Sequence, residues 1–268
     1  MTSSMDERPV VFIDSGVGGL PYCGEFARIL PMESIVYVAD RENFPYGPKS
    51  KKELSDLLAV LVARLVVRMD PKLVVIACNT ASVSALADLR AAFPNISIVG
   101  TVPAVKPAAL SSKTGRIGIL ATERTISDQY SRHLVERFAP ECAVEGIAAP
   151  ELVEFVENDF IASSRAERES MASNYIERFR ALGVDSLVLG CTHFLYLAEE
   201  FAKAAGGDMK VFDSRAGVAE RAASLLQARG TTGERVLYVT GTRPLEESWH
   251  RFAGLFRIGS CLLLDDAR

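Results

Sequence analysis

The sequence predicts an α/β fold of two similar domains with mainly parallel sheets, and two matched segments are the main evidence. An apolar run at 72–77 ends in Cys78, and a second run at 186–190 ends in Cys191. Short apolar runs rich in Val and Leu are typical of strands buried on both faces, as in a parallel sheet. Open α/β sheets bind ligands beyond the carboxyl ends of such strands. Both thiols are therefore expected at positions where such folds perform chemistry.

The first part of the chain alternates predicted strands and helices. Its opening strand ends in Asp14-Ser15, and a glycine-rich turn follows before a helix that reaches about Leu30. Ser50 and Glu53 have the spacing of a capping box at the start of the next helix. The predicted strands are 10–13, 34–39, 72–77 and 96–99, and the further helices are 51–68 and 81–92.

From Gly115 the same pattern starts again. The strand 116–121 leads into a polar loop, 122–125, just as the first strand leads into Asp14-Ser15. Further strands are expected at 142–147 and 186–190, with helices ending near Phe138 and at 151–159, 165–182 and 192–204. The remaining strands, 209–212, 235–239 and 261–264, are expected to lead the chain back to the first domain.

This repetition predicts a duplicated, pseudo-symmetric molecule with the active site at the domain interface. The gap between Ser15 and Cys78 is similar to the gap between Thr122 and Cys191. Pro103 and Pro107 are expected to interrupt regular structure where the chain crosses over. We therefore expect a first domain of residues 1–101 plus 214–268 and a second domain of residues 102–213.

The composition excludes several classes of protein. The 268 residues are 49% hydrophobic and 24% charged, as in folded globular proteins. The net charge of −4 gives no broad attraction to nucleic acid or to an anionic membrane. No run approaches the ~20 apolar residues of a membrane span. The polar segment 1–9 does not have the apolar core of a secretion signal, so a cytoplasmic location is expected.

The five cysteines are scattered, and the histidines number only three. Since no C-x-x-C pair occurs, neither a zinc nor an iron–sulfur site is expected, and the odd count favours reduced thiols. Cys23, Cys142 and Cys261 have no polar neighbours like those of Cys78 and Cys191, and they are interpreted as structural. Taken singly, even Cys78 and Cys191 would be interpreted as buried apolar residues.

The segment 14–19 invites comparison with a dinucleotide-binding turn. A G-x-G-x-x-G frame that starts at Gly16 would need glycine at Pro21, and a carboxylate at Asp14 would repel phosphate. A nucleotide-dependent oxidoreductase is therefore disfavoured. The simplest alternative for Asp14 and Ser15 is that they cap a helix.

Two thiols in matched settings are suited to inverting a stereocentre that bears a hydrogen. One base removes the proton from one face of the carbon while an acid supplies a proton to the other face. Only a few per cent of an ordinary cysteine is thiolate at pH 7, so each thiol needs assistance. Asp14 is the candidate assistant for Cys78, and His193 is the candidate for Cys191, with an acid from the set Glu151, Glu154 and Glu157. A merely structural role for His193 stays open at this point.

Four motifs, in this order, resemble those of the glutamate racemases. They are Asp14-Ser15-Gly16-Val17-Gly18-Gly19-Leu20, Pro45-Tyr46-Gly47-Pro48, Ala77-Cys78-Asn79-Thr80-Ala81 and Leu189-Gly190-Cys191-Thr192-His193. The resemblance covers nearly the whole chain, including Val102-Pro103-Ala104 and Thr240-Gly241. The chain departs from the usual pattern at Pro21-Tyr22-Cys23 and at Leu195-Tyr196, where a proline is common.

The resemblance implies a cofactor-independent enzyme with no metal, which interconverts L- and D-glutamate and supplies D-glutamate for peptidoglycan of the bacterial cell wall. Cys78 would act on the D-enantiomer and Cys191 on the L-enantiomer, with Asp14 and His193 assisting. In the family the assisting glutamate follows an apolar pair, and since Phe155-Val156-Glu157 fits that pattern, the resemblance favours Glu157 over Glu154 as the assisting acid. Substrate contacts would come from Asp14, Ser15, Tyr46, Gly47, Asn79, Thr80, Thr122, Thr125, Thr192 and His193. A homodimer is left open.

Two alternatives remain at this point. The polar pocket suits a dicarboxylic amino acid but does not fix its length, so an aspartate or other small-acid racemase is the nearest competitor. A catalytically idle α/β protein that binds a small acid is the other. The presence of both cysteines argues against it.

Overall fold

The computed structural model describes residues 6–227 and 230–265, and the chain divides into two compact units. Unit 1 contains residues 1–101 and 215–268, and unit 2 contains residues 102–214. These limits differ by one residue from the division expected from the sequence. Residues 1–5 of the polar amino-terminal segment lie outside the described residues. Within the described ranges, no helix is long and apolar enough to cross a membrane.

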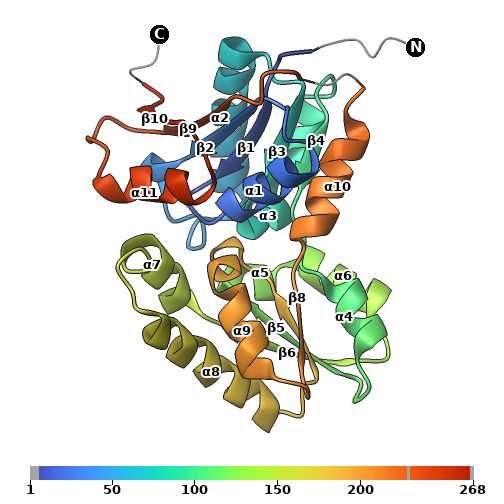
Figure 1. Cartoon of the computed structure of the whole chain (residues 1–268). Coiled ribbons are helices and arrows are strands. Elements are labelled where there is room, and N and C mark those ends of the chain that lie inside the picture. The colour runs from blue at the N-terminus through green and yellow to red at the C-terminus, as the bar shows by residue number, and fades with distance from the viewer. Residues whose placement is uncertain (1–5, 228–229, 266–268) are drawn as a thin grey trace. The chain divides into compact units, whose positions relative to one another are not determined.

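Unit 1 is built on a six-stranded parallel sheet (Figure 1). Its strands are β1 (Val10–Asp14), β2 (Ile35–Ala39), β3 (Leu73–Ile76), β4 (Ile98–Gly100), β9 (Arg235–Val239) and β10 (Ser260–Leu263). Its helices are α1 (Leu20–Ile29), η1 (Arg41–Asn43), α2 (Lys51–Met69), α3 (Asn79–Ala92), α10 (Arg215–Leu225) and α11 (Glu247–Leu255). The strand order is β10-β9-β2-β1-β3-β4.

Both faces of this sheet are covered, which explains why β2, β3 and β1 up to Ile13 are apolar. On one face, Val11 and Ile13 pack with α2 residues such as Leu58 and Leu65. On the other, the ring of Phe12 lies 5.5 Å from that of Phe26 in α1. Strands buried on both faces lose the alternation of polar and apolar residues, as predicted.

The glycine-rich turn after β1 packs tightly against the sheet. The Tyr37 hydroxyl donates to the Gly16 carbonyl at 2.9 Å and accepts from the Gly19 amide at 3.0 Å. A Cβ atom at Gly19 would lie 2.7 Å from both the Cβ and the carbonyl oxygen of Ala77. The glycine therefore permits a close approach between this turn and the segment that leads to Cys78.

Unit 2 is built on a four-stranded parallel sheet of order β6-β5-β7-β8. Its strands are β5 (Arg116–Ala121), β6 (Ala143–Ala148), β7 (Ser186–Leu189) and β8 (Lys210–Phe212). Its helices are α4 (Val105–Ser111), α5 (Glu123–Ser127), α6 (Gln129–Phe138), α7 (Pro150–Asn158), α8 (Arg165–Ala181), η2 (Thr192–Leu197) and α9 (Ala198–Ala205).

The first four strands of each unit share one order. In unit 1 the order is second, first, third, fourth (β2-β1-β3-β4), and unit 2 repeats it as β6-β5-β7-β8. All the pairings are parallel. This common topology confirms the prediction of two similar α/β units. β9 and β10 extend the first sheet beyond β2.

Three local expectations were wrong. Pro107 does not interrupt regular structure, because it is the third residue of α4, where an amide has no partner within the helix anyway. The predicted polar loop 122–125 is instead a helix start, in which the Thr122 side chain accepts from the Thr125 amide. Strand 209–212 pairs with β7, so the return to unit 1 begins only after it.

The capping box predicted at Ser50 is present only in part. The Ser50 hydroxyl accepts from the Glu53 amide at 3.2 Å, while Glu53 is exposed and lies near Lys49. A complete capping box occurs instead at Ser164 and Glu167, at the start of α8. Both are Ser-x-x-Glu sequences, but only the one at Ser50 was predicted as a capping box from the sequence.

Candidate functional site

Cys78 lies at the junction of β3 and α3. The Ala77 amide donates to the Ile13 carbonyl at 2.7 Å, which continues the pairing of β3 with β1 for one residue. Cys78 is then the extended N-cap residue of α3, with φ −137° and ψ 122°. Its side chain is 6% exposed. The thiol therefore lies at the carboxyl edge of the sheet and at the amino end of a 14-residue helix, where the helix dipole favours negative charge.

Asp14 and Ser15 lie on the neighbouring strand end. Asp14 is fully buried, and its Oδ1 accepts the Ser15 amide proton at 2.6 Å. The Asp14 carbonyl accepts from the Asp40 amide at 2.8 Å. Because β1 lies directly between β2 and β3, Asp14 and Cys78 lie at adjacent strand ends.

The first turn of α3 contains Asn79 and Thr80, both buried. Neither Oδ1 nor Nδ2 of Asn79 has a hydrogen-bond partner. Buried amides almost always have partners, and leaving one without a partner costs free energy. An amide in this state next to a strand-end cysteine is what a site built for a polar ligand requires.

Tyr46 is held by an acid that sequence analysis did not place in the site. Its hydroxyl donates to Asp40 Oδ2 at 2.7 Å, and the Thr240 hydroxyl donates to Asp40 Oδ1 at 2.9 Å. Asn43 Nδ2 lies 3.0 and 3.1 Å from the same two carboxylate oxygens. Burial first, and then the negative charges of Asp40, Cys78 and Asp14, raises the pKa of Tyr46 well above its ordinary value. Tyr46 is therefore a neutral donor beside the thiol.

The sequence does contain one indication of a role for Asp40. This acid directly follows the second strand, as Asp14 ends the first strand. Its partner Thr240 comes from the end of β9, so the network joins segments that are far apart in sequence. Gly47, which follows Tyr46, is half-buried, and no atom lies within 4 Å of the position of a Cβ there.

Cys191 has the corresponding position in unit 2. It follows β7 and is the extended N-cap residue of η2, with φ −129° and ψ 138°. Its exposure is 6%, the same as that of Cys78. The segment that follows is a 3-10 helix rather than the α-helix predicted, and α9 begins only at Ala198. The two thiols thus have matched backbone conformation and burial, each within its own unit.

Cys191, His193 and Glu157 form a chain of contacts. The Cys191 sulfur lies 3.8 Å from His193 Nδ1, and His193 Nε2 lies 2.6 Å from Glu157 Oε1. The His193 side chain is 4% exposed and that of Glu157 is 11% exposed. A thiol, an imidazole and a carboxylate in series can move a proton to or from the sulfur.

The surroundings of His193 set its charge. Burial is the largest influence and lowers the pKa, but the hydrogen bonds to Cys191 and Glu157 and their negative charges outweigh it, so the pKa of His193 is raised well above its ordinary value. An imidazolium is therefore favoured between the two acids near neutral pH.

The other two acids of α7 have different positions. The Tyr175 hydroxyl donates to Glu151 Oε1, and burial together with this contact raises the pKa of Tyr175. Glu154 lies on the exposed face of the helix. Of the three candidates weighed from the sequence, the structure thus brings Glu157 to His193.

The hydroxyl pair of unit 2 is closely associated. Thr122 and Thr125 have their Oγ1 atoms 3.0 Å apart, and Thr122 Oγ1 also accepts from the Thr125 amide. Thr125 and Thr192 are both 1% exposed. Thr122 follows β5 as Asp14 ends β1, so the two units offer comparable polar groups at their first strand ends.

The remaining thiols have surroundings of a different kind. Burial raises the pKa of Cys23 to about 12 and that of Cys261 to about 11, so both remain thiols near neutrality. Cys142 is half-buried. Among the residues that the structure describes, no group of three or more His, Cys, Asp or Glu side chains is arranged to hold a metal ion.

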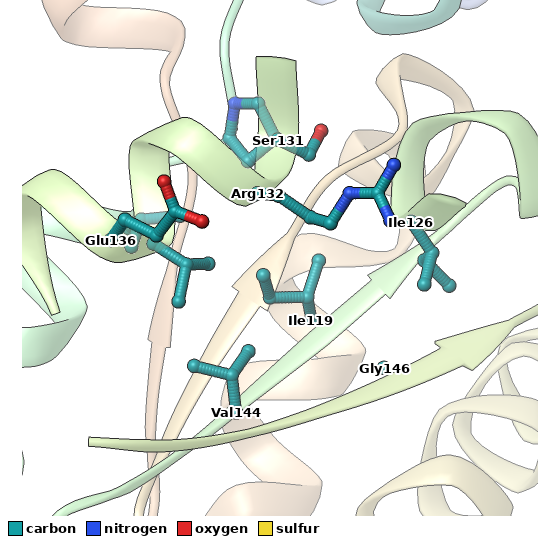
Figure 2. A pocket seen from close by; sticks show the side chains of 10 residues that line it. Ile119, Ile126, Ser131, Arg132, Glu136, Val144 and Gly146 are labelled. Atoms are coloured by element: carbon teal, nitrogen blue, oxygen red, sulfur yellow. The ribbon is translucent and has the colours of Figure 1, made fainter. Parts of the chain in front are cut away.

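A pocket of about 300 Å³ lies elsewhere in unit 2, between α6 and the β5–β6 edge of the sheet (Figure 2). Its wall is largely apolar and includes Ile119, Ile126 and Val144, with Arg132 and Glu136 on the helix. None of the site residues predicted from the sequence lines it. The pocket is therefore separate from the arrangement around Cys191.

Comparison with known proteins places these features in a family. The profile of the Asp/Glu/Hydantoin racemase family matches residues 25–222. The sequence is 40% identical to the glutamate racemase of Roseiflexus sp. over 228 residues, which cover 85% of this chain and 83% of that protein. It is 39% identical to the glutamate racemase of Brucella anthropi over 236 residues, with the same two coverages.

Solved structures show the same similarity. The structure of Escherichia coli glutamate racemase in complex with L-glutamate and the activator UDP-MurNAc-ala matches with a TM-score of 0.84 and 31% identity, covering 96% of this chain and 98% of that one. The structure of Francisella tularensis glutamate racemase in complex with D-glutamate matches with a TM-score of 0.79 and 27% identity, covering 97% and 98%.

Proposed function

This chain belongs to the glutamate racemases of the Asp/Glu/Hydantoin racemase family, and from that premise we propose that Cys78 and Cys191 are the two bases of the reaction. The enzyme is an isomerase that interconverts L- and D-glutamate. The observation that supports the two-thiol assignment is the matched placement of the cysteines. Each is a buried, extended N-cap residue at the end of the third strand of its unit.

In the proposed reaction, one cysteine enters as thiolate and the other as thiol. The thiolate removes the α-proton of glutamate, which leaves a carbanion, and the opposite thiol gives its proton to the other face of that carbon. The first cysteine is then a thiol and the second a thiolate, so protons and charge balance without an oxidant. We assign Cys78 to the D-enantiomer and Cys191 to the L-enantiomer. The return reaction needs only the reverse roles.

Each thiol has its own assistant in this proposal. Asp14 assists Cys78 from the adjacent strand end, whereas His193 assists Cys191 and is itself held by Glu157. The raised pKa of His193 supports this role, because an imidazolium whose Nδ1 lies 3.8 Å from the Cys191 sulfur can exchange a proton with it.

We propose that polar groups of both units bind the charged ends of the substrate. The buried amide of Asn79, which has no partner, is the strongest candidate. The neutral hydroxyl of Tyr46 and the first-turn hydroxyl of Thr80 belong to the same unit. The full proposed set is Asp14, Ser15, Tyr46, Gly47, Asn79, Thr80, Thr122, Thr125, Thr192 and His193.

The proposed role in the cell is the supply of D-glutamate for peptidoglycan, with the enzyme in the cytoplasm and no cofactor required. Support for this role comes from the family to which the chain belongs. A homodimer is a further proposal that a measurement of molecular mass in solution would test.

The test of this function is exchange of the α-hydrogen with solvent. Incubation of either glutamate enantiomer with the enzyme in D2O, without any added cofactor, is expected to introduce deuterium at the α-carbon, detected by ¹H NMR or mass spectrometry. Aspartate and other small amino acids serve as comparisons. Brisk exchange with aspartate and none with glutamate would instead favour an aspartate racemase.

A further inference from the structure

We propose that Tyr196, acting with Phe160 and Arg168, is a positioning residue that holds Glu157 against His193. This inference rests on the proposed role of His193 in the reaction and adds to it a specific cause for the short contact between His193 and Glu157. Tyr196 lies in one of the segments where the sequence departs from the usual family pattern. The proposed function itself assigns no role to this tyrosine.

Phe160 lies just beyond the end of α7, three residues after Glu157. Its amide donates to the Phe155 carbonyl at 2.8 Å, which closes the end of the helix. Its carbonyl accepts from the Ser163 hydroxyl at 2.8 Å, so the turn that follows is also fixed. The position of the Phe160 side chain is therefore tied to the last turn of α7, which contains Glu157.

The ring of Phe160 is packed between two other elements. The Tyr196 ring of η2 meets it edge to face, with centroids 5.0 Å apart and an interplanar angle of 67°. The Arg168 guanidinium of α8 lies 5.1 Å from the centroid of the same ring. Both geometries are attractive, because the edge of one ring or a cation faces the electron-rich face of the other.

Arg168 connects this packing back to the segment of Tyr196. Its Nε lies 3.7 Å from Glu200 Oε1 in α9, and Glu200 follows Tyr196 by one helical turn. The contacts therefore form a closed series from η2 to the end of α7, to α8 and back to α9. We call Tyr196, Phe160 and Arg168 the aromatic clamp.

The aromatic clamp acts on the two elements whose separation decides the His193–Glu157 contact. His193 is three residues before Tyr196 in η2, and Glu157 is three residues before Phe160. A contact of 2.6 Å between His193 and Glu157 requires η2 and the end of α7 to keep a fixed position relative to each other. Loss of the Tyr196 ring would let the end of α7 move away from η2, so the carboxylate would contact the imidazole less often.

Among the residues that the structure describes, Cys191 and Glu157 are the acids with the largest influence on the pKa of His193. The strand β7 contributes no titratable side chain, Glu151 of α7 binds Tyr175, Glu154 is exposed, and Glu200 of α9 pairs with Arg168. The state of the Glu157 contact is therefore measurable at His193 itself.

The test compares Tyr196→Ala with Tyr196→Phe, which keeps the ring. In ¹⁵N-labelled protein, the imidazole of His193 is identified by its absence from His193→Asn, and its pKa is followed by NMR. With Tyr196→Ala we expect this pKa to fall toward its ordinary value. We also expect kcat to fall by between about twofold and about tenfold, with little change in KM. This factor corresponds to the interaction free energy of one aromatic pair. Tyr196→Phe should retain both values.

Phe138→Ala is the matched control, because it removes another partly buried ring with cation contacts in unit 2. It should lower the melting temperature but leave the titration of His193 unchanged. The double variant Glu157→Gln/Tyr196→Ala should have nearly the same His193 pKa and the same kcat as Glu157→Gln alone. Both substitutions weaken the same contact between His193 and residue 157, so their effects should not add. Additive effects in the double variant, or an unchanged His193 titration in folded Tyr196→Ala, would overturn the proposal. The titration needs no turnover, so it stays interpretable even if glutamate is not the substrate.

Discussion

His193 links the thiol of Cys191 to the carboxylate of Glu157, and its charge depends on both. The acids raise its pKa even though burial opposes the charge. A buried cation of this kind is stable only while its partners remain, so the His193–Glu157 ion pair contributes to folding stability.

Glu157→Gln is expected to change the pH dependence of stability in a defined direction. Because the folded pKa of His193 lies above its unfolded value of about 6.5, the contribution of the pair is fully present below that value and is lost as pH rises through the folded pKa. The difference in free energy of unfolding between the wild type and Glu157→Gln should therefore be largest in mild acid and shrink in alkaline solution. Urea titrations across pH measure it.

Glu154→Gln, on the exposed face of the same helix, is the control for this experiment. It should show no such pH dependence. A wild-type minus Glu157→Gln difference that grew with rising pH would contradict the assignment of a protonated His193.

Asn79→Ala separates binding from stability. We expect KM for glutamate to rise by about tenfold to about a hundredfold, the value of a hydrogen bond to a charged group. The melting temperature should not fall, because the amide has no protein partner to lose. Ser84→Ala is the matched control, since its buried hydroxyl also has no partner and lies in the same helix. It should leave KM unchanged, and an equal rise there would argue against Asn79 as a substrate ligand.

At the scale of elements, strongly patterned segments could be predicted and their ends could not. Continuous apolar runs identified β1, β3 and β7 because both faces of each sheet are covered. Short helices were not predicted where a single residue's place in the first turn, or one hydrogen bond of its side chain, determines the local structure. Pro107 is tolerated because it lies in a first helical turn, and Thr122 begins a helix because its hydroxyl binds an amide.

The Asp40 network could not be predicted for a related reason. Asp40 and Tyr46 are close in sequence, but Thr240, which completes the network, follows the strand β9. Only the pairing of β9 with β2 brings the two segments together. In the sequence Asp40 is an isolated acid at the end of a strand, and only the tertiary structure supplies its partners.

Gly19 tests the packing of the turn against the segment that leads to Cys78. Gly19→Ala places a methyl group 2.7 Å from Ala77 atoms, and overpacking of this kind should cost roughly 1–3 kcal/mol of stability. Gly217→Ala, in the exposed part of α10 with no atom within 4 Å, should instead stabilise by about 0.5–1 kcal/mol. Chemical denaturation of both variants measures the contrast, and equal effects would contradict the close-approach role of Gly19.

At the scale of the whole molecule, the strand order repeats between the units, and in each repeat a cysteine follows shortly after the third strand and begins a helix. The surroundings of the two thiols differ, because Asp14 ends the strand adjacent to that of Cys78, whereas His193 and Glu157 follow Cys191 in a series of contacts. A duplicated fold thus supplies two similar thiols with different neighbours. This is the requirement of an enzyme that must accept either enantiomer.

The most direct test of the two-thiol proposal is the racemisation rate of Cys78→Ala and Cys191→Ala, followed by circular dichroism from each glutamate enantiomer. Cys261→Ala serves as the control, because its thiol belongs to neither site and remains protonated near neutrality. We predict that each of the first two variants loses racemisation in both directions while Cys261→Ala retains it. Near-normal turnover in either folded Cys78→Ala or folded Cys191→Ala would contradict the proposal.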